Sequence, residues 1–260
     1  MHERHGFYRF QLPMDPPLAQ TCFEQLSKVV RLDAVTSGRV GNHLTRPSEQ
    51  GIPLVRTTTS YESPPLLFTQ AHDEITHRIH KTIQSMGWSD LGEEQPNHAL
   101  LEIYDQRYRK MGFHSDQALD LDPRSYIAIF SCYDRAPQRA LRCLSVKSKE
   151  TDERFSIELT PHSVVLFSVQ TNARYLHKIH LPNGGDEDIS WLGITFRRAK
   201  SFLRFDEGLP RFASGELLTL ATEEQRSQLF KLRGQENRST QCPYPELTYT
   251  VSAGDLLAPG

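Results

Sequence analysis

Seven short apolar segments between residues 99 and 205 constrain the fold of this chain more than any other feature. Clusters of Asp, Pro, Gly and Asn separate them, and no segment with a helical period intervenes. The segments read ALLEIYD, SYIAIFSCY, ALRCLSV, RFSIEL, SVVLFSV, ARYLHKIHL and WLGITFRR. Closely spaced strands of this kind are typical of antiparallel sandwiches, barrels and jelly rolls rather than of parallel βαβ sheets. We therefore expect a mainly β protein with flanking helices, of the α+β class.

Helical and extended segments precede this region. Residues 7–12 and the β-branched run 52–61 predict strands. A helix is expected at about 17–30. A second one is expected over 65–86, where apolar residues recur at a helical period and Gly87 ends the run.

The tail, residues 206–260, carries one further helix candidate at 222–234, whose final glycine is expected to end it. We expect the tail to pack on the same domain. The chain is thus predicted to form a single domain over 1–260. Within it, 1–98 supplies N-terminal strands and helices, 99–205 forms the core, and the tail is a C-terminal extension.

Composition excludes several function classes. The formal charge of −2 gives no overall attraction to nucleic acid or to an anionic membrane. Four cysteines lie far apart without a C-x-x-C pair, which indicates reduced thiols rather than a zinc finger or a disulfide scaffold. No apolar run approaches the roughly 18–20 residues of a membrane span. A cytoplasmic protein that does not insert in membranes is the expectation, and the oligomeric state is left open.

The stretch KMGFHSDQALDLDPRSYIAIF, residues 110–130, places His114 and Asp116 two positions apart, immediately before an apolar strand. Two residues apart in an extended chain lie on the same side. They are either a pair of metal ligands or two solvated polar residues at a strand end. His77 and His80 are three apart on the predicted helix 65–86, but no acidic residue accompanies them at the spacing of the zincin motif. We interpret them as solvated or capping side chains.

If the core is a jelly roll, a second histidine on a distant strand would complete a mononuclear iron site. Such a site uses two His and one carboxylate and leaves coordination positions open. The segment SVVLFSVQTNARYLHKIHL offers His177 and His180.

At these residues the chain resembles the Fe(II)/2-oxoglutarate-dependent dioxygenases, and within them the AlkB-like branch. The resembling stretches are GFHSDQ, LFSVQTNARYLHKI and GITFRRA, and the resemblance covers roughly residues 99–200. It implies a double-stranded β-helix (jelly-roll) core, with His114, Asp116 and His177 as ligands of Fe(II). His177 is preferred because LHKI matches the family's H-x-I pattern, whereas His180 is expected at a solvated rim.

The resemblance also implies 2-oxoglutarate and O₂ as cosubstrates. Arg197 matches the last Arg of the family's R-x-N-x-T-x-R pattern, and Tyr104 matches a tyrosine that contacts 2-oxoglutarate. A guanidinium suits the distal carboxylate of this cosubstrate.

The sequence departs from the family at three positions of the cosubstrate pocket. Trp191 stands in place of the first Arg of that pattern, Gly193 in place of its Asn, and Glu102 in place of another Asn. The distal carboxylate is therefore expected to pair with Arg197, with help from Arg198, or with an Arg from another strand such as Arg142. Asn172 orients a neighbouring loop or ligand, or simply forms a turn.

The preferred function is oxidation, mainly hydroxylation, of a small molecule or natural-product intermediate, with release of succinate and CO₂. The alternative is AlkB-type oxidative demethylation of bases in nucleic acid, which requires phosphate contacts and a stacking pocket. Tyr61, Tyr108 and Phe113 and the basic stretch DQRYRK are compatible with it, but the acidic total and the altered Arg-x-Asn pattern count against it. A non-catalytic jelly-roll binding module is a third interpretation.

Overall fold

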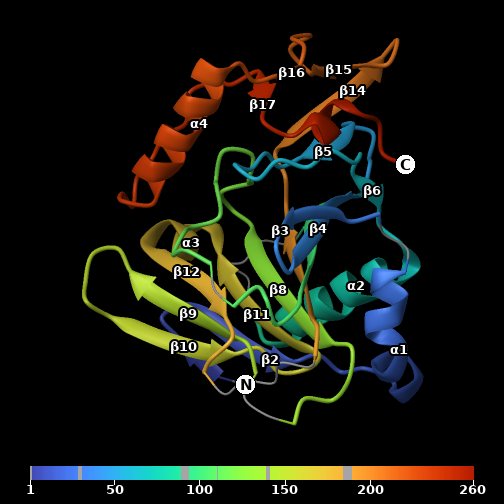
Figure 1. Cartoon of the computed structure of the whole chain (residues 1–260), viewed down its shortest axis with the longest axis vertical. Coiled ribbons are helices and arrows are strands. Elements are labelled where there is room, and N and C mark those ends of the chain that lie inside the picture. Colours follow the sequence, from blue (N-terminus) through green and yellow to red (C-terminus); the bar gives the residue numbers. More distant parts are fainter. Residues whose placement is uncertain (1, 29–30, 89–93, 110, 139–140, 184–188) are drawn as a thin grey trace.

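A nine-stranded sheet forms the centre of the computed structural model, which describes residues 2–28, 31–88, 94–109, 111–138, 141–183 and 189–260 (Figure 1). Its strands are β1 (His2–Arg4), β2 (Phe7–Gln11), β3 (Asp33–Thr36), β4 (Arg39–Thr45), β6 (Leu66–Leu67), β7 (His98–Tyr104), β8 (Tyr126–Tyr133), β11 (Ser163–Ser168) and β13 (Trp191–Arg197). The spatial order is β1-β2-β11-β8-β13-β7-β4-β3, and β6 pairs with β4. Neighbours along this path are antiparallel.

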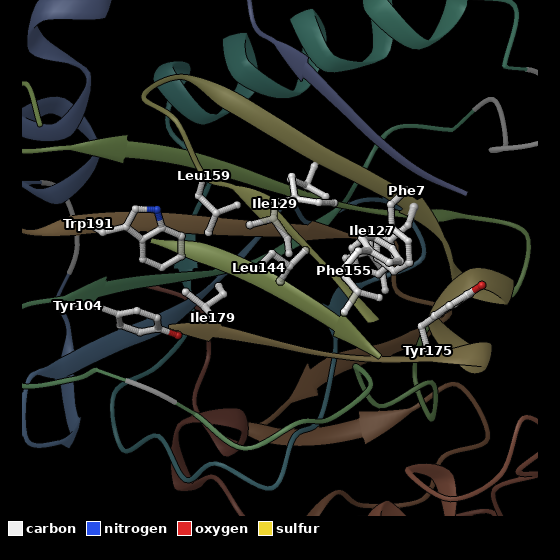
Figure 2. Close-up of a cluster of buried hydrophobic side chains, with 14 of the residues drawn as sticks. Phe7, Tyr104, Ile127, Ile129, Leu144, Phe155, Leu159, Tyr175, Ile179 and Trp191 are labelled. Carbon is white, nitrogen blue, oxygen red and sulfur yellow. The ribbon is translucent and has the colours of Figure 1, made fainter. Parts of the chain in front are cut away.

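A three-stranded sheet packs against one face of this main sheet. It contains β9 (Cys143–Ser148), β10 (Arg154–Glu158) and β12 (Tyr175–His180), in the order β10-β9-β12. Its strands alternate between buried and more exposed residues, so that one face of each strand is covered. The buried face and the main sheet enclose a common core, in which Trp191 and Tyr104 lie at one end and Phe155 and Tyr175 toward the other (Figure 2).

Two helices cover the opposite face of the main sheet, α1 (Pro16–Ser27) and α2 (Gln70–Ser85) (Figure 1). Ile75 and Ile79 of α2 form a second core with Phe130 and Ile194 of the sheet. Strand β8 is buried on both faces because it lies between these two cores. The predicted mainly β fold with flanking helices is thus confirmed.

The C-terminal segment forms further elements beside the barrel. They are β14 (Ser201–Asp206) and β15 (Leu209–Phe212), which form a sheet with β5 (Ile52–Leu54), together with β16 (Thr219–Leu220), α4 (Glu223–Glu236), β17 (Tyr249–Thr250) and a 3-10 helix at Ala253–Leu256. Arg56 ties this segment to the core. Its guanidinium donates to both carboxylate oxygens of Asp120 and to the carbonyl oxygens of Leu247 and Tyr249.

All seven strands expected between residues 99 and 205 are present as β7 to β13, with small shifts at their ends. The sixth predicted segment, ARYLHKIHL, is only partly a strand. Its first two residues belong to the helix α3 (Val169–Arg174). The strand expected at 7–12 is present as β2. The division into 1–98, 99–205 and 206–260 stays a prediction, although β2 and β4 of the first region lie inside the main sheet.

Four further expected elements differ from the structure. Of the strand predicted over 52–61 only β5 is found. Beyond it, the amides of Arg56 and Thr59 donate to the side chains of Asp120 and Thr57 instead of to a neighbouring strand. The helix predicted from residue 65 begins at Gln70, with Thr69 as its N-cap, since β6 precedes it. In the tail, α4 starts as expected but continues through Gly234 to Glu236.

The first helix ends at Ser27 rather than near residue 30, and residues 29–30 lie outside the described part of the chain. Among the described residues, no helix is long and apolar enough to cross a membrane.

Candidate metal centre and cosubstrate pocket

His114 and His177 are brought together by the backbone. His114 lies in the connection between β7 and β8, and it forms an isolated antiparallel bridge with His177 of β12. The two amides donate to each other's carbonyls, at N···O distances of 3.0 and 2.7 Å. Both rings therefore lie on the same side, with centroids 4.7 Å apart. Residues sixty-odd positions apart are thus fixed as neighbours by two hydrogen bonds.

Asp116 is held by Asn172 of α3. The Asn172 side chain accepts a hydrogen bond from the amide of Asp116 at 2.9 Å and donates to its carbonyl at 2.8 Å. Ser115, between the two candidate ligands, donates from its hydroxyl to the carbonyl of Tyr175. Asn172 therefore orients the loop that carries the carboxylate, which was one of the two roles expected for it.

The ligand atoms of His114, Asp116 and His177 all lie within 4.8 Å of one another. The Nδ1 atom of His114 is 3.0 Å from the carbonyl of Gly112, which leaves Nε2 free as an acceptor if Nδ1 carries the proton. Burial, followed by the neighbouring His177 ring, lowers the pKa of His114 to about 3, so this imidazole is neutral at physiological pH. Two imidazoles and one carboxylate on one face fit a divalent metal such as Fe(II).

Arg197 lies beside this group, at the end of β13. Its Nε and Nη2 atoms are both 2.8 Å from one carboxylate oxygen of Asp116. Burial alone would raise the pKa of Asp116, but the Arg197 guanidinium and the His177 ring lower that pKa well below its ordinary value. Nη1 of Arg197 is buried and has no partner in the described part of the chain. Arg197 thus keeps Asp116 ionised and retains one donor for a ligand.

The other end of β13 is filled by Trp191. A Cβ atom on Gly193 would lie 2.0 Å from the Trp191 ring, so the indole folds over a position where only glycine fits. The same indole packs against Tyr104, with ring centroids 4.9 Å apart. The place of the family's first Arg is therefore occupied by an aromatic side chain that is only 2 % exposed.

A guanidinium is nevertheless present in the same row of the sheet. Arg39 of β4 is directly opposite Tyr104 of β7, which in turn is opposite Trp191 of β13. The Nε atom of Arg39 donates to Glu102 at 2.6 Å, and the Tyr104 hydroxyl donates to the same carboxylate at 2.7 Å. The sequence does not point to Arg39, because it does not reveal that β4 lies beside β7.

The structure also places the other predicted residues. Arg142 donates to the carbonyls of Asp105 and Tyr108 and so fixes the loop after β7. Arg198 lies on the other side of β13, in ion pairs with Glu94 and Asp122. Neither of these two arginine side chains lies beside the His-Asp-His triad.

The remaining histidines lie apart from the triad as well. His180, three positions after His177, is half-buried on the outer side of β12, and its Nδ1 is 3.4 Å from the Ser145 hydroxyl. His77 is exposed on α2, and His80 on the same helix contacts Gln84.

A cavity of about 650 Å³ lies beside the triad and also reaches Arg39 and Tyr104. The triad, Arg197 and Thr195 line one part of it, and Arg39, Glu102, Tyr104 and Tyr108 line another. The cavity reaches the C-terminal helix α4, which contributes Phe230, Arg233, Gly234 and Asn237. A metal at the triad would therefore face a cavity large enough for organic ligands.

Comparisons with known proteins place this architecture. Residues 16–197 match the family model described as the 2OG-Fe(II) oxygenase superfamily. Comparison with curated protein sequences gives no significant match.

Among solved structures, "The structure of OsALKBH1" is similar at a TM-score of 0.53 and 12% identity, covering 76% of this chain and 100% of that one. A Pseudomonas putida prolyl-4-hydroxylase is similar at a TM-score of 0.46 and 14% identity, covering 75% of this chain and 93% of that one. The first likeness shows a shared fold. The family match spans more than half of the chain and contains the His-Asp-His group. This chain therefore belongs to the 2OG-Fe(II) oxygenase superfamily, whose members are dioxygenases that use Fe(II), 2-oxoglutarate and O₂.

Proposed function

We propose that this enzyme oxidises, mainly by hydroxylation, a small organic substrate, with conversion of 2-oxoglutarate and O₂ to succinate and CO₂. The observation that carries the proposal is the cavity of about 650 Å³ beside the His-Asp-His group. Its volume lies within the range of about 300–1,000 Å³ that small-molecule sites occupy.

In this proposal His114, Asp116 and His177 hold the metal. The ionised Asp116 and the neutral His114 are ready to bind a cation, and Arg197 offsets the carboxylate charge until one is bound. The bound iron, with 2-oxoglutarate and O₂, supplies the oxidising chemistry. The protein supplies the cavity in which the substrate is positioned beside the metal.

Two guanidinium groups are proposed to bind the cosubstrate. Nη1 of Arg197 is a buried donor next to the metal ligands, with no partner among the residues that the structure describes. Arg39 is proposed for the distal carboxylate, because it lies in the same sheet row as Trp191 and lines the same cavity. A role of Tyr104 in binding the cosubstrate stays a prediction, since its hydroxyl proton is given to Glu102.

The test is succinate formation from 2-oxoglutarate by the Fe(II)-loaded protein under air, in the presence of pooled small metabolites. We expect succinate to increase with a particular pool, together with a product that has gained one oxygen atom. The His177→Ala variant should form neither. If no pool of small molecules raises succinate formation, while a methylated oligonucleotide does, the proposal is wrong.

Demethylation of nucleic acid remains the second candidate because aromatic rings line the cavity. Tyr108 and Phe113 could stack on a flipped base. The basic stretch DQRYRK supports it less than the sequence suggests, because Arg107 pairs with Asp105. Release of formaldehyde from methylated single-stranded DNA or RNA, with affinity that falls steeply with salt, would favour this function.

A cytoplasmic location likewise stays a prediction.

A further inference from the structure

Helix α4 forms one wall of the cavity although it lies beyond the family match, which ends at residue 197. In Figure 1 the helix, drawn in orange-red, stands apart from the layers of the barrel. Leu229 of this helix is buried in a small separate core with Leu119 and Val251. The exposed Phe230 and the half-buried Arg233 are directed to the cavity instead.

The helix is attached directly to the loop that carries the metal ligands. Asn237 accepts a hydrogen bond from the amide of Ser115, and Glu236 accepts one from the amide of Ala118, both at 2.9 Å. Lys149 donates to the carbonyl of Glu236 at 2.7 Å. These contacts fix the distance between α4 and the triad, so side chains of α4 can position a ligand relative to the metal.

The charges along the cavity point to Arg233. Among the described residues, four guanidinium groups line the cavity: those of Arg39, Arg56, Arg197 and Arg233. The first three form ion pairs with Glu102, Asp120 and Asp116, respectively.

Arg233 has no carboxylate partner among the described residues, and its Nη1 donates only to the Thr58 hydroxyl, at 2.6 Å. Burial lowers the pKa of Arg233, and the carboxylates of Asp116 and Glu236, which do not form ion pairs with it, offset this only in part.

Phe230 adds an apolar surface beside this cation. It precedes Arg233 by three positions and therefore lies on the same side of the helix. Its side chain is 47% exposed, although it lines the cavity. A large exposed aromatic residue beside an unpaired guanidinium suits a ligand that combines an apolar group with an acid.

We propose that Arg233 and Phe230 recognise the substrate that is oxidised, and that this substrate is a small organic acid. Its carboxylate pairs with Arg233, and its apolar part lies against Phe230 and extends toward the metal. The inference rests on the proposed function and specifies its substrate class. The same carboxylate chemistry is also present in 2-oxoglutarate, so the experiment has to distinguish the two sources.

The experiment uses the full chain loaded with Mn(II) and saturated with 2-oxoglutarate, with phenylacetate and its neutral isostere phenylacetamide as probes. Paramagnetic broadening of the probe's NMR signals reports binding near the metal, and titration gives the dissociation constant. We expect phenylacetate to bind at least tenfold more tightly than phenylacetamide. Arg233→Ala should remove this preference, and Arg233→Lys should retain part of it. Phe230→Ala should weaken the binding of both probes.

Arg238→Ala is the matched control, because Arg238 is exposed just after α4 and does not line the cavity. It should leave the preference for phenylacetate unchanged. The affinity for 2-oxoglutarate, measured by calorimetry on the same variants, should also be unchanged in Arg233→Ala. A loss of 2-oxoglutarate affinity in that variant would assign Arg233 to the cosubstrate and overturn the inference.

The remaining outcomes separate this inference from the proposed function. If the wild-type protein binds neither Mn(II) nor 2-oxoglutarate, the proposed function itself fails. If it binds both but shows no preference for phenylacetate, or keeps the preference after Arg233→Ala, only the assignment of Arg233 is wrong.

Discussion

Two buried ion pairs at opposite ends of one cavity differ in what their carboxylates can do. Arg197 binds Asp116, whose carboxylate also lies 3.5 Å from Nε2 of His177. Arg39 binds Glu102, whose other neighbour is the Tyr104 hydroxyl. The first carboxylate has two imidazoles beside it and can accept a metal, whereas the second has no further metal ligand among the described residues. The side chains around each carboxylate thus decide its role. With two imidazoles nearby it can bind a metal, and without them it only neutralises the charge of its arginine.

The largest effect is expected from removing one imidazole of the first site. His177→Ala should weaken metal binding by more than about 100-fold, because the site loses one of three ligands. His180→Ala, on the outer side of the same strand, is the control and should bind metal normally. Metal per protein after loading and dialysis, measured by mass spectrometry, tests this. Equal loss in both variants would show that the triad is assigned incorrectly.

The second prediction concerns the stability that each arginine provides. Arg197→Ala leaves a buried carboxylate unpaired and should lower the free energy of unfolding by about 3–5 kcal/mol. Added Zn(II) should restore much of this loss, since the metal supplies the missing positive charge. Arg39→Ala should also be destabilising, but without recovery. Urea unfolding with and without Zn(II) measures the free energy of unfolding of both variants. If Zn(II) restored the stability of both variants equally, the difference proposed between the two ion pairs would be wrong.

A third buried carboxylate, Asp255, sharpens the comparison because no guanidinium of the described residues is hydrogen-bonded to it. It accepts a hydrogen bond from Thr250, and burial raises its pKa from 3.8 to about 7. The folded state holds this proton between about pH 4 and 7 while the unfolded state releases it, so stability falls as pH rises through this window and is constant above it. Asp255→Asn removes the proton uptake. The free energy of unfolding of this variant, relative to that of the wild type, should therefore be higher at pH 8 than at pH 5, by on the order of 2–3 kcal/mol.

Urea unfolding of the wild type and of Asp255→Asn at the two pH values provides this measurement, and other titrating groups cancel in the difference. A gain that is the same at both pH values would mean that Asp255 is ionised in the folded protein throughout.

The smallest effect concerns the second ion pair and the cosubstrate. Arg39→Ala should weaken 2-oxoglutarate binding about tenfold, and should leave 2-oxobutanoate unaffected because that acid has no distal carboxylate. Glu102→Gln should strengthen 2-oxoglutarate binding a few-fold, since it removes a competing negative charge. Calorimetry on the Mn(II)-loaded protein gives both values. Unchanged 2-oxoglutarate affinity in Arg39→Ala would place the distal carboxylate elsewhere.

The sequence by itself determined the strands of the core and the three candidate metal ligands. Short apolar segments separated by turn-forming residues specify strands locally, which is why all seven segments of 99–205 were predicted. The spacing of His114 and Asp116, together with the resemblance around His177, sufficed to name the triad, whose convergence the structure shows. The element ends were less predictable, as the extension of α4 beyond Gly234 illustrates. There Glu236 is bonded to Ala118 and Lys149, which are distant in the chain.

Only the tertiary structure decided what surrounds the metal ligands. Arg39 stands in one row with Tyr104 and Trp191 because β4, β7 and β13 are neighbours in a particular register, which local sequence does not encode. Trp191 can fill its end of the barrel because Gly193 lacks a side chain beneath it. Arg233 reaches the cavity because α4 is bonded to the loop of the triad. Strand formation depends on neighbours along the chain, whereas the pocket depends on strands and helices that meet only after folding.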